Sequence, residues 1–295
     1  MNVSCALSDA RAILSDQTEA EILLSFAMRR KREFLISHPE AKILPTALRR
    51  FRMLSAKRSS GVPIAYLTGH KEFYGLDFCM EPGVFIPRPE TEILVEEVFN
   101  VYRKNYELRM TNYKLRICDI GTGSGCLAIT LAKHLSKAHV TAVDISPKAL
   151  KLAKKNAQIH SVADRITFFK SDLLDVIASK VKQSPFDIII TNLPYIGLNE
   201  DNFVSKEVLD YEPAQALFGG ETGLELFEKL FQQIIAMRFK PQWLIAEIGF
   251  SQQQALAKLI KKYFGNTAVL WKNDLAGLPR MFTIFFNKSA SLRSA

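Results

Sequence analysis

From Leu115 onward the chain alternates between strand-like and helix-like segments, and this alternation limits the folds it can adopt. Short apolar segments rich in β-branched residues predict seven strands, near residues 115–120, 139–144, 165–170, 186–191, 242–248, 267–271 and 281–286. Helical segments follow the first two strands, at 126–135 and 147–160. Strands separated by helices are typical of a parallel sheet that is covered by helices. We therefore predict an α/β fold with a seven-stranded, doubly wound, Rossmann-like sheet.

One of these strands is followed by a polar tetrapeptide. The strand begins at Asp187 and contains three consecutive isoleucines, which are typical of a central strand buried on both faces. The residues that follow it are Asn192, Leu193, Pro194 and Tyr195. Open parallel sheets bind ligands outside the carboxyl ends of their strands. These four residues are therefore candidate catalytic residues, although taken alone they also fit a simple strand-ending turn.

The tetrapeptide carries the groups needed to methylate a planar nitrogen. Such a nitrogen, in a carboxamide or an aromatic amine, is a poor nucleophile because its lone pair is delocalised. The Asn192 side-chain oxygen and the Leu193 carbonyl would accept its two N–H bonds and favour the charge that builds there during attack. Tyr195 would stack on the flat group, while Pro194 would keep the turn rigid. No general base is required, since the methylated cation is acidic enough to lose its proton to water.

A glycine-rich loop follows the first predicted strand and opens a helix. It runs from Gly121 to Gly125, with Thr122, Gly123 and Ser124 between them. A backbone without bulky side chains can approach a ligand closely, and the first N–H groups of the helix point towards it. We predict that these five residues bind a cofactor.

Three further positions extend the predicted cofactor site. The second strand ends at Asp144, whose carboxylate can accept hydrogen bonds from both hydroxyls of a ribose. Asp172 and Leu173 follow the third strand, where the acid would reach an adenine amino group and the leucine would cover the ring. Dinucleotide enzymes share part of this arrangement, but their fingerprint has glycine or alanine at the position of Cys126. The spacing of the glycines instead favours S-adenosylmethionine, which has no pyrophosphate.

The first 90 residues differ in pattern from the rest. Residues 1–60 are predicted to be helical. A capping box of Thr18 and Glu21 would begin one helix that continues to Ser37, and a second helix would begin near Pro45. Loosely alternating residues with glycines at turn positions predict a β-hairpin after them. The expected domains are a helical domain at 1–68, a hairpin linker at 69–90 and the sheet domain at 91–295.

Charge and composition limit the partners of the chain. Its net charge is +9, and the segment from Arg29 to Arg58, the basic window, has ten basic residues against two acids. Such a surface attracts nucleic acid or an acidic protein, or it is a solvated helix face. The four cysteines lack metal-binding spacing, so we predict no metal site. With no apolar segment of membrane-spanning length and no targeting sequence, we predict a cytoplasmic protein that does not associate with membranes.

Several longer motifs are required neither by the strand pattern nor by the glycine loop. Together they extend over nearly the whole chain, at residues 61–69, 73–76, 82–91, 119–125, 211–213, 216–220, 247–249 and 274–280. In these motifs, above all Gly61-Val-Pro-Ile-Ala-Tyr66 and Phe85-Ile-Pro-Arg88-Pro-Glu-Thr91, the chain resembles the release-factor glutamine methyltransferases, the HemK/PrmC family.

The resemblance implies a class I methyltransferase domain that uses S-adenosyl-L-methionine. The substrate would be the side-chain nitrogen, N5, of the glutamine in the Gly-Gly-Gln motif of peptide-chain release factors, which act in translation termination. The family pattern places the cofactor at Gly121, Gly123, Gly125, Asp144, Leu173 and Asn192. The tetrapeptide would hold the substrate glutamine. The helical domain and hairpin would dock the release factor, and we expect a monomer.

The chain departs from the family pattern at two positions. The family usually has Asn-Pro-Pro-Tyr, and Leu193 replaces the first proline while keeping the carbonyl acceptor. Leu173 stands where an aromatic residue is common. Asn-Leu-Pro-Tyr also resembles the tetrapeptide of ribosomal-RNA adenine methyltransferases. The alternative function is therefore N6-adenine methylation of RNA or DNA, with the basic window as a nucleic-acid surface and the adenine flipped into the same site. The intact Asn192 and Tyr195 argue against a non-catalytic cofactor-binding or assembly protein.

Overall fold

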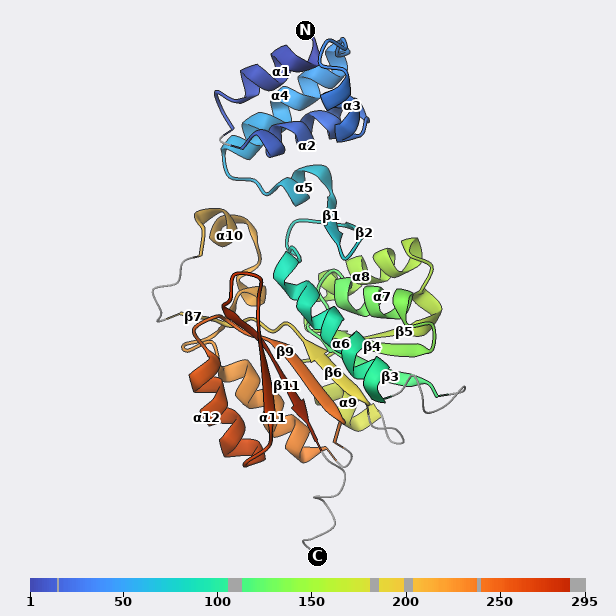
Figure 1. The fold of residues 1–295 in the computed structure, drawn as a ribbon, viewed down its shortest axis with the longest axis vertical. Helices are drawn as coiled ribbons and strands as arrows, with labels where there is room; N and C mark the ends of the chain where they lie inside the picture. The colour runs from blue at the N-terminus through green and yellow to red at the C-terminus, as the bar shows by residue number, and fades with distance from the viewer. Residues whose placement is uncertain (15, 106–112, 181–185, 199–203, 238–239, 287–295) are drawn as a thin grey trace, which may run out of the picture. The chain divides into compact units, whose positions relative to one another are not determined.

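The computed structural model describes residues 1–14, 16–105, 113–180, 186–198, 204–237 and 240–286 (Figure 1). The chain divides into two compact units. The helical unit contains Met1–His70, Met80–Pro82 and Val204–Tyr211, and the sheet unit contains Lys71–Cys79, Gly83–Phe203 and Glu212–Ala295. Residues 287–295, which the sequence analysis assigned to the sheet domain, lie outside the described residues.

The helical unit is built from short helices around a small apolar core. They are α1 (Val3–Ala10), α2 (Gln17–Met28), α3 (Arg32–Ser37), α4 (Pro45–Ser59), α5 (Ile64–Thr68) and α10 (Lys206–Tyr211). Leu23 and Leu24 of α2 pack with Phe51 and Leu54 of α4 in this core. The prediction that residues 1–60 are helical is confirmed, as is the helix start at Pro45, where a proline loses no intrahelical hydrogen bond.

The details of the first predicted helix were wrong. The N-cap of α2 is Asp16, which accepts a hydrogen bond from the Thr18 N–H at 2.7 Å, so Thr18 lies inside the helix and caps nothing. The predicted single helix to Ser37 is two helices, because Arg29 adopts left-handed backbone angles with φ 54° and ends α2. Left-handed caps favour glycine or asparagine, so an arginine there gave no warning in the sequence.

The predicted hairpin is present after the helices. Strand β1 (His70–Phe73) pairs with β2 (Leu76–Cys79) in a two-stranded sheet. The two residues that join them, Tyr74 and Gly75, have φ 51° and 72°. Two central residues with positive φ are what a tight hairpin turn matched to the strand twist requires.

The sheet unit has the predicted seven-stranded sheet. Its strands, in chain order, are β3 (Leu115–Ile120), β4 (Ala138–Asp144), β5 (Ile166–Lys170), β6 (Ile188–Thr191), β9 (Trp243–Glu247), β10 (Val269–Asn273) and β11 (Pro279–Phe285). Their order in the sheet is β10-β11-β9-β6-β3-β4-β5. Strand β11 is antiparallel to both neighbours, and the other pairs are parallel. A small separate sheet pairs β7 (Ile196–Gly197) with β8 (Phe218–Gly220).

Helices cover both faces of this sheet, as the fold class predicts (Figure 1). One apolar cluster joins one face to α6 (Glu92–Asn105) and α7 (Cys126–His134). A second cluster joins the other face to α9 (Asp175–Lys180), α11 (Glu225–Ala236) and α12 (Gln253–Phe264). The remaining elements of this unit are α8 (Pro147–Ile159) and the short 3-10 helices η1 (Pro89–Thr91), η2 (Ala163–Arg165) and η3 (Ala214–Ala216).

The strand order reverses at one point of the sheet. From β3 the chain moves outward through β4 to β5, and it then returns to add β6 on the other side of β3. The connections that leave β3 and β6 therefore go to opposite sides. This reversal is where open α/β sheets bind their ligands, at the carboxyl ends of the strands.

Candidate functional site

The glycine loop and the tetrapeptide lie side by side at this reversal point. The last pair in the ladder between β3 and β6 is Ile120 with Thr191. Gly121 and Asn192 are the next residues on the two strands, and a Cβ atom added at Gly121 would lie 3.8 Å from the Asn192 carbonyl oxygen. The two predicted groups of site residues are thus brought together by adjacent strands.

The glycine loop is held in place by its backbone. The amide groups of Gly121 and Thr122 both donate to the Val143 carbonyl at 2.9 Å, which ties the loop to the end of β4. Gly125 has φ 85°, and a Cβ atom there would lie 2.8 Å from Ile129 Cδ1 and 3.1 Å from Ala153 Cβ. A glycine is required at this position because α7 begins in close contact with α8.

Asp119, at the end of β3, is a buried acid to which the sequence analysis gave no role. Its Oδ2 accepts hydrogen bonds from the Thr122 hydroxyl at 2.6 Å and from the Ala128 N–H at 3.2 Å. Its Oδ1 is buried and has no hydrogen-bond partner among the described residues. Burial raises the pKa of Asp119 to about 7. An unpaired buried oxygen beside the loop suits a cationic or hydrogen-bond-donating group of a ligand.

Asp144, the acid predicted to bind a ribose, lies at the end of β4 beside the loop. Its Oδ2 accepts a hydrogen bond from Gly123 N–H at 2.9 Å, and its Oδ1 accepts one from Ser146 N–H at 2.8 Å. Burial raises the pKa of this carboxyl. A carboxylate has about four acceptor positions, so roughly two remain for a ligand.

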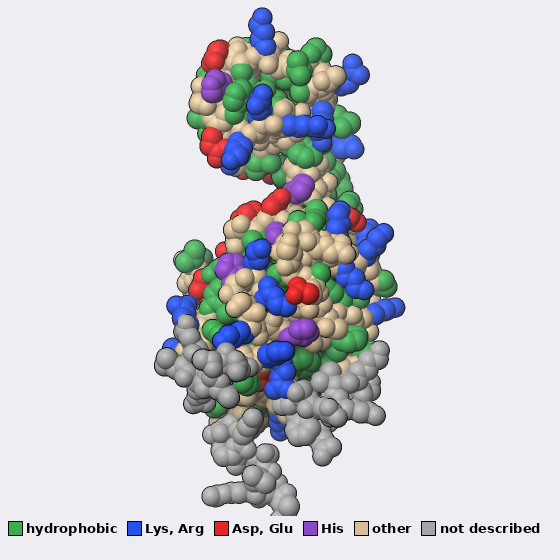
Figure 2. Space-filling view, turned by 90° about the vertical axis from the view of Figure 1, so that its right-hand side faces the viewer, with side chains coloured by type: hydrophobic (Ala, Val, Ile, Leu, Met, Phe, Trp, Pro, Cys, Tyr) green, Lys and Arg blue, Asp and Glu red, His purple; other side chains and the backbone are tan. Residues whose placement is uncertain are grey.

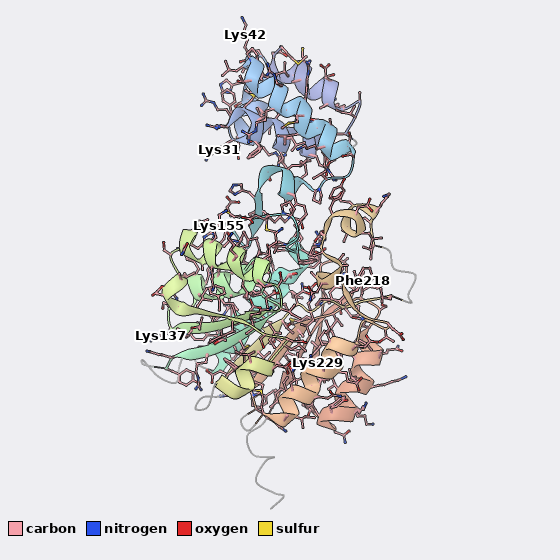
Figure 3. The ribbon with its side chains drawn as sticks, turned by 180° about the vertical axis from the view of Figure 1, so that it is seen from behind. Lys31, Lys42, Lys137, Lys155, Phe218 and Lys229 are labelled. Atoms are coloured by element: carbon pink, nitrogen blue, oxygen red, sulfur yellow. The ribbon has the colours of Figure 1, made fainter. Side chains whose placement is uncertain are left out.

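Asp172 and Leu173 follow β5, but only Leu173 is buried. The Asp172 carboxylate pairs with Lys229 at 2.6 Å, so part of its acceptor capacity is already used. Lys229 lies on α11 (Figure 3). Leu173 has φ 51° and belongs to the same apolar cluster as Val143 of β4. Strained left-handed residues of this kind concentrate at ligand sites.

Asn192 has one side of its amide fixed. Its Nδ2 donates to the Thr91 hydroxyl oxygen at 3.1 Å. Its Oδ1 accepts no hydrogen bond from the described residues and therefore keeps its acceptor positions for a ligand. The next side chain, Leu193, is buried and packs near Gly121. The leucine that replaces the usual proline thus contributes to the core below the loop.

Tyr195 is held at both its ring and its backbone. The phenol donates to Glu247 Oε1 at 3.3 Å, and the carbonyl accepts from Gln252 Nε2 at 2.7 Å. A Cβ atom added at Gly223 would lie 2.1 Å from the Tyr195 carbonyl oxygen, so no side chain fits at position 223. The aromatic residue of the tetrapeptide is therefore closely confined.

Glu247 is the second buried acid of the site. Burial raises its pKa to about 7, although the Thr91 hydroxyl, the charge of Arg280 and the Tyr195 hydroxyl all lower it. Burial also raises the pKa of Tyr195, and the neighbouring Glu247 charge adds to that rise. The Tyr195 phenol is therefore a hydrogen-bond donor at neutral pH.

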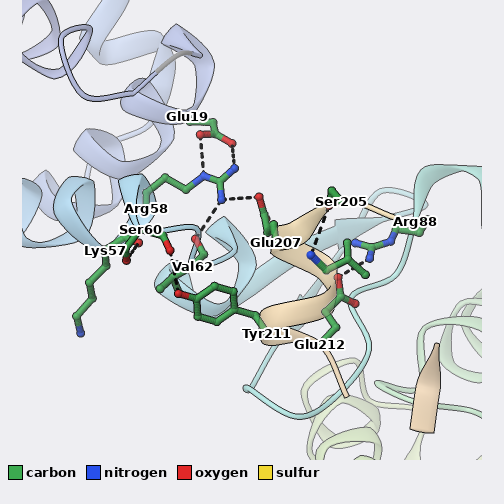
Figure 4. A network of polar contacts seen from close by, with 11 residues as sticks. Glu19, Lys57, Arg58, Ser60, Val62, Arg88, Ser205, Glu207, Tyr211 and Glu212 are labelled. Carbon is green, nitrogen blue, oxygen red and sulfur yellow. Dashed lines mark hydrogen bonds and ion pairs between the residues drawn. The ribbon is translucent and has the colours of Figure 1, made fainter. Parts of the chain in front are cut away.

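The proline-rich segment before α6 is anchored by another buried acid. Glu212 accepts a hydrogen bond from Ile86 N–H at 3.1 Å and forms an ion pair with Arg88 (Figure 4). The same segment ends at Thr91, the partner of Asn192. The motif around Pro87 and Pro89 thus holds one wall of the site in a fixed position.

Sequence reasoning missed three residues that support the tetrapeptide: Thr91, Glu247 and Gln252. Both Thr91 and Glu247 stand in motifs of the family resemblance. The segment that ends at Thr91 fits a stiff connector or a role at the mouth of the site equally well, and neither side chain had a predicted role of its own. A signal was available for Glu247, because it ends an apolar strand at the same edge of the sheet as the tetrapeptide. Its packing against Tyr195 depends on contacts 52 positions apart in the chain, which no local pattern reveals.

The basic window is partly neutralised within the helical unit. Arg58 binds both carboxylate oxygens of Glu19 at 2.7 Å and also Glu207 at 2.7 Å (Figure 4). Arg32 pairs with Glu21 at 2.7 Å. Most other cations of the window are exposed, and Lys and Arg side chains are frequent on the face of this unit that Figure 2 shows.

The described residues contain neither a candidate membrane span nor a candidate metal cluster. Among those residues no helix combines the length and the apolar character needed to cross a membrane. Within the same part of the chain, no group of three or more His, Cys, Asp or Glu residues is placed to hold a metal ion.

Two protein families match the chain, one in its helical N-terminal part and one in its sheet domain. Residues 2–69 match the PrmC N-terminal domain, and residues 90–264 match a methyltransferase domain. A release factor glutamine methyltransferase of Koribacter versatilis is 38% identical over 267 residues, which cover 90% of each chain. A release factor glutamine methyltransferase of Clostridium acetobutylicum is 34% identical over 288 residues, which cover 95% of this chain and 97% of the relative.

Solved structures show the same fold at lower sequence similarity. The N-terminal domain of human METTL16 in complex with SAH is 18% identical to the chain, with a TM-score of 0.55. The match covers 81% of this chain and 84% of that domain. At this identity the similarity concerns the fold alone.

Proposed function

Since the chain belongs to the release factor glutamine methyltransferase family, we propose that it transfers a methyl group from S-adenosyl-L-methionine to a release factor. The acceptor would be the N5 side-chain nitrogen of the glutamine in the Gly-Gly-Gln motif. The family is shown by relatives that match nine-tenths or more of the chain. The target motif and the atom methylated are part of the proposal.

The residues around the glycine loop fit the proposed cofactor. Two acceptor positions remain on Asp144 for the ribose hydroxyls, and the unpaired Oδ1 of Asp119 suits a donor group. Leu173 would cover the adenine, and Asp172 would meet its amino group alongside Lys229. Thr122 and Ser124 are buried and would shape the loop from Gly121 to Gly125. When bound, S-adenosylmethionine supplies an electrophilic methyl group on a sulfonium.

The free Oδ1 of Asn192 is the observation on which the proposed mechanism depends. Because Nδ2 already donates to Thr91, the amide presents its oxygen to the substrate. Oδ1 and the Leu193 carbonyl would accept the two N–H bonds of the glutamine amide and hold its nitrogen in line for attack. Both acceptors also stabilise the positive charge that develops on that nitrogen. Water would then take the proton released by the methylated product.

The remaining residues of the tetrapeptide position the flat amide. Tyr195 would stack on it, with its ring confined by Glu247 and Gln252. Pro194 restricts the backbone before it and keeps the Leu193 carbonyl aimed. A single glutamine side chain offers little surface for specificity, so the helical unit would dock the body of the release factor. A monomer would suffice, since each of these groups comes from one chain.

The test is methyl transfer from labelled S-adenosylmethionine to three acceptors in parallel. They are a purified release factor, the same factor with Gly-Gly-Gln changed to Gly-Gly-Glu, and ribosomal RNA. We expect label on the unmodified factor only. Asn192→Ala should lower kcat by at least about 100-fold, as removal of one transition-state hydrogen-bonding group does elsewhere, while the fold stays intact.

The other outcomes would contradict the proposal. Label on both release factors would mean that another residue is methylated. Label on the RNA would favour adenine N6 methylation and assign the basic window to nucleic acid. Activity of Asn192→Ala close to that of the wild type would remove the proposed mechanism.

A further inference from the structure

Glu247 contacts groups at both ends of the tetrapeptide: it is hydrogen-bonded to Tyr195, and it lies beside Thr91, the partner of Asn192. It lies at the end of β9, the neighbour of β6, and is only 1% exposed. Its Oε1 accepts from the Tyr195 phenol at 3.3 Å. On the other side the Thr91 hydroxyl, itself 2% exposed, interacts with the same carboxylate and accepts from Asn192 Nδ2. The acid is thus bound to Tyr195 directly, and its only connection to Asn192 among the described residues is through Thr91.

The chemistry of these groups sets the direction of the hydrogen bonds. An ionised carboxylate can only accept, so a hydroxyl next to it directs its hydrogen towards it. The Thr91 oxygen is then left as an acceptor, and Asn192 must offer it an N–H rather than its oxygen. The result is that Asn192 Oδ1 faces away from Thr91 and stays free.

No hydrogen bond of ordinary geometry joins Thr91 to Glu247 among the described residues, although the hydroxyl is close enough to lower the pKa of the acid. Glu247 Oε2 is buried and meets no donor at ordinary hydrogen-bond distance among the described residues. A buried oxygen of this kind is costly to maintain unless the site uses it. A glutamate at this position is therefore better explained by an effect on the site than by a gain in stability.

We propose that Glu247 is a positioning residue that fixes the orientation of the Asn192 amide through Thr91 and the ring of Tyr195 through its phenol. This inference rests on the proposed function, because it assigns the free Asn192 oxygen to the substrate amide. Glu247 itself does not touch the substrate. Its replacement acts on kcat, since the acceptor is misdirected in the transition state while the cofactor loop is unchanged.

The charged groups around Glu247 define when it is ionised. Arg280 favours the carboxylate, whereas Glu90 opposes it, and burial raises the pKa to about 7. Burial raises the pKa of the nearby Cys126 thiol to about 12, and the charge of Glu247 adds a small part of that rise. The thiol therefore stays neutral around pH 7. We therefore expect kcat of the wild type to rise as the pH passes through about 7 and Glu247 loses its proton.

The test compares Glu247→Gln with Glu247→Ala. Glutamine has nearly the same shape, but its amide can donate to Thr91, which would then turn its own hydrogen to Asn192 Oδ1. We expect kcat of Glu247→Gln to fall about 10- to 100-fold, as for other misplaced catalytic groups, and to be no better than that of Glu247→Ala. The dissociation constant for S-adenosylhomocysteine, measured by calorimetry, should stay within about twofold of wild type. The rise of kcat around pH 7 should be absent.

Matched variants separate this role from general packing. Glu97→Gln removes another buried glutamate, bound to Lys272 and Thr283, and should keep the wild-type kcat and pH profile. Thr91→Val should lower kcat as Glu247→Gln does, whereas Thr91→Ser should restore it. This pair keeps the inference testable if the Glu247 variants fail to fold.

The outcomes are distinct. An active wild type with a Glu247→Gln variant of normal kcat, or with glutamine rescuing the loss seen for alanine, would overturn the positioning role and leave the proposed function in place. A wild type that binds S-adenosylhomocysteine but methylates no release factor would overturn both.

Discussion

Replacing Asp144 tests the proposed cofactor site most quantitatively. The carboxylate accepts hydrogen bonds from Gly123 N–H at 2.9 Å and from Ser146 N–H at 2.8 Å, which occupy about two of its four acceptor positions. The two positions left would accept the ribose hydroxyls. Hydrogen bonds to a charged group contribute about 1.5–3 kcal/mol each, and water recovers part of that loss at an open site. We expect Asp144→Ala to weaken binding by about 1–3 kcal/mol, which is about 5- to 150-fold in the dissociation constant.

The assay is calorimetric titration with S-adenosylhomocysteine at 25 °C, after circular dichroism has shown that the variant is folded. Asp164, an exposed acid on η2, provides the matched control, and Asp164→Ala should bind as the wild type does. A 2′,3′-dideoxy analogue completes the cycle, since Asp144→Ala should cause little further loss for a ligand without those hydroxyls. An unchanged dissociation constant in a folded Asp144→Ala protein would refute the role given to this residue.

Three other changes test the remaining parts of the account. Leu193→Pro should keep kcat within about threefold, because no described residue accepts a hydrogen bond from the Leu193 N–H and the proline keeps the carbonyl. A large loss of kcat in the methyl-transfer assay would show that the leucine side chain itself matters. Gly223→Ala places a Cβ atom 2.1 Å from the Tyr195 carbonyl oxygen, so we expect urea denaturation to show a loss of about 3 kcal/mol together with lower kcat. Burial raises the pKa values of Asp119 and Glu247 from 3.8 and 4.5 to about 7. As the pH rises from about 4 to about 7, the unfolded chain loses these protons before the folded protein does. Both groups therefore lower the free energy of unfolding over this pH range. Asp119→Asn with Glu247→Gln should remove that decrease relative to the wild type, and an identical pH dependence in the two proteins would contradict it.

Much of the fold follows from local pattern. Three isoleucines in β6 and the alternation with helices identify a parallel sheet, because burial on both faces demands continuous apolar strands. The predicted ends of the helices were less accurate. The break at Arg29 and the cap at Asp16 depend on single backbone angles and hydrogen bonds that an apolar stripe does not encode. The placement of α10 with the helical unit, through Arg58 and Glu207, is likewise a long-range contact.

The positions of the candidate site residues were predictable where each residue ends a strand or directly follows one. Gly121, Asp144 and Asn192 all stand at carboxyl ends of parallel strands, so the topology alone brings them to one edge. Support from Thr91 and Glu247 was not predictable in the same way. It depends on side chains that meet across elements far apart in the chain, and a buried acid with an unpaired oxygen shows itself only once the packing is known.

Locating the added methyl group tests the central claim most directly. A release factor incubated with the enzyme and S-adenosylmethionine would be digested, and the peptide with the Gly-Gly-Gln motif fragmented by tandem mass spectrometry. The account predicts one methyl group on the glutamine side-chain nitrogen with the wild type and none with Asn192→Ala. A methyl group on any other residue, or an unmodified peptide with a wild type that binds S-adenosylhomocysteine, would contradict it.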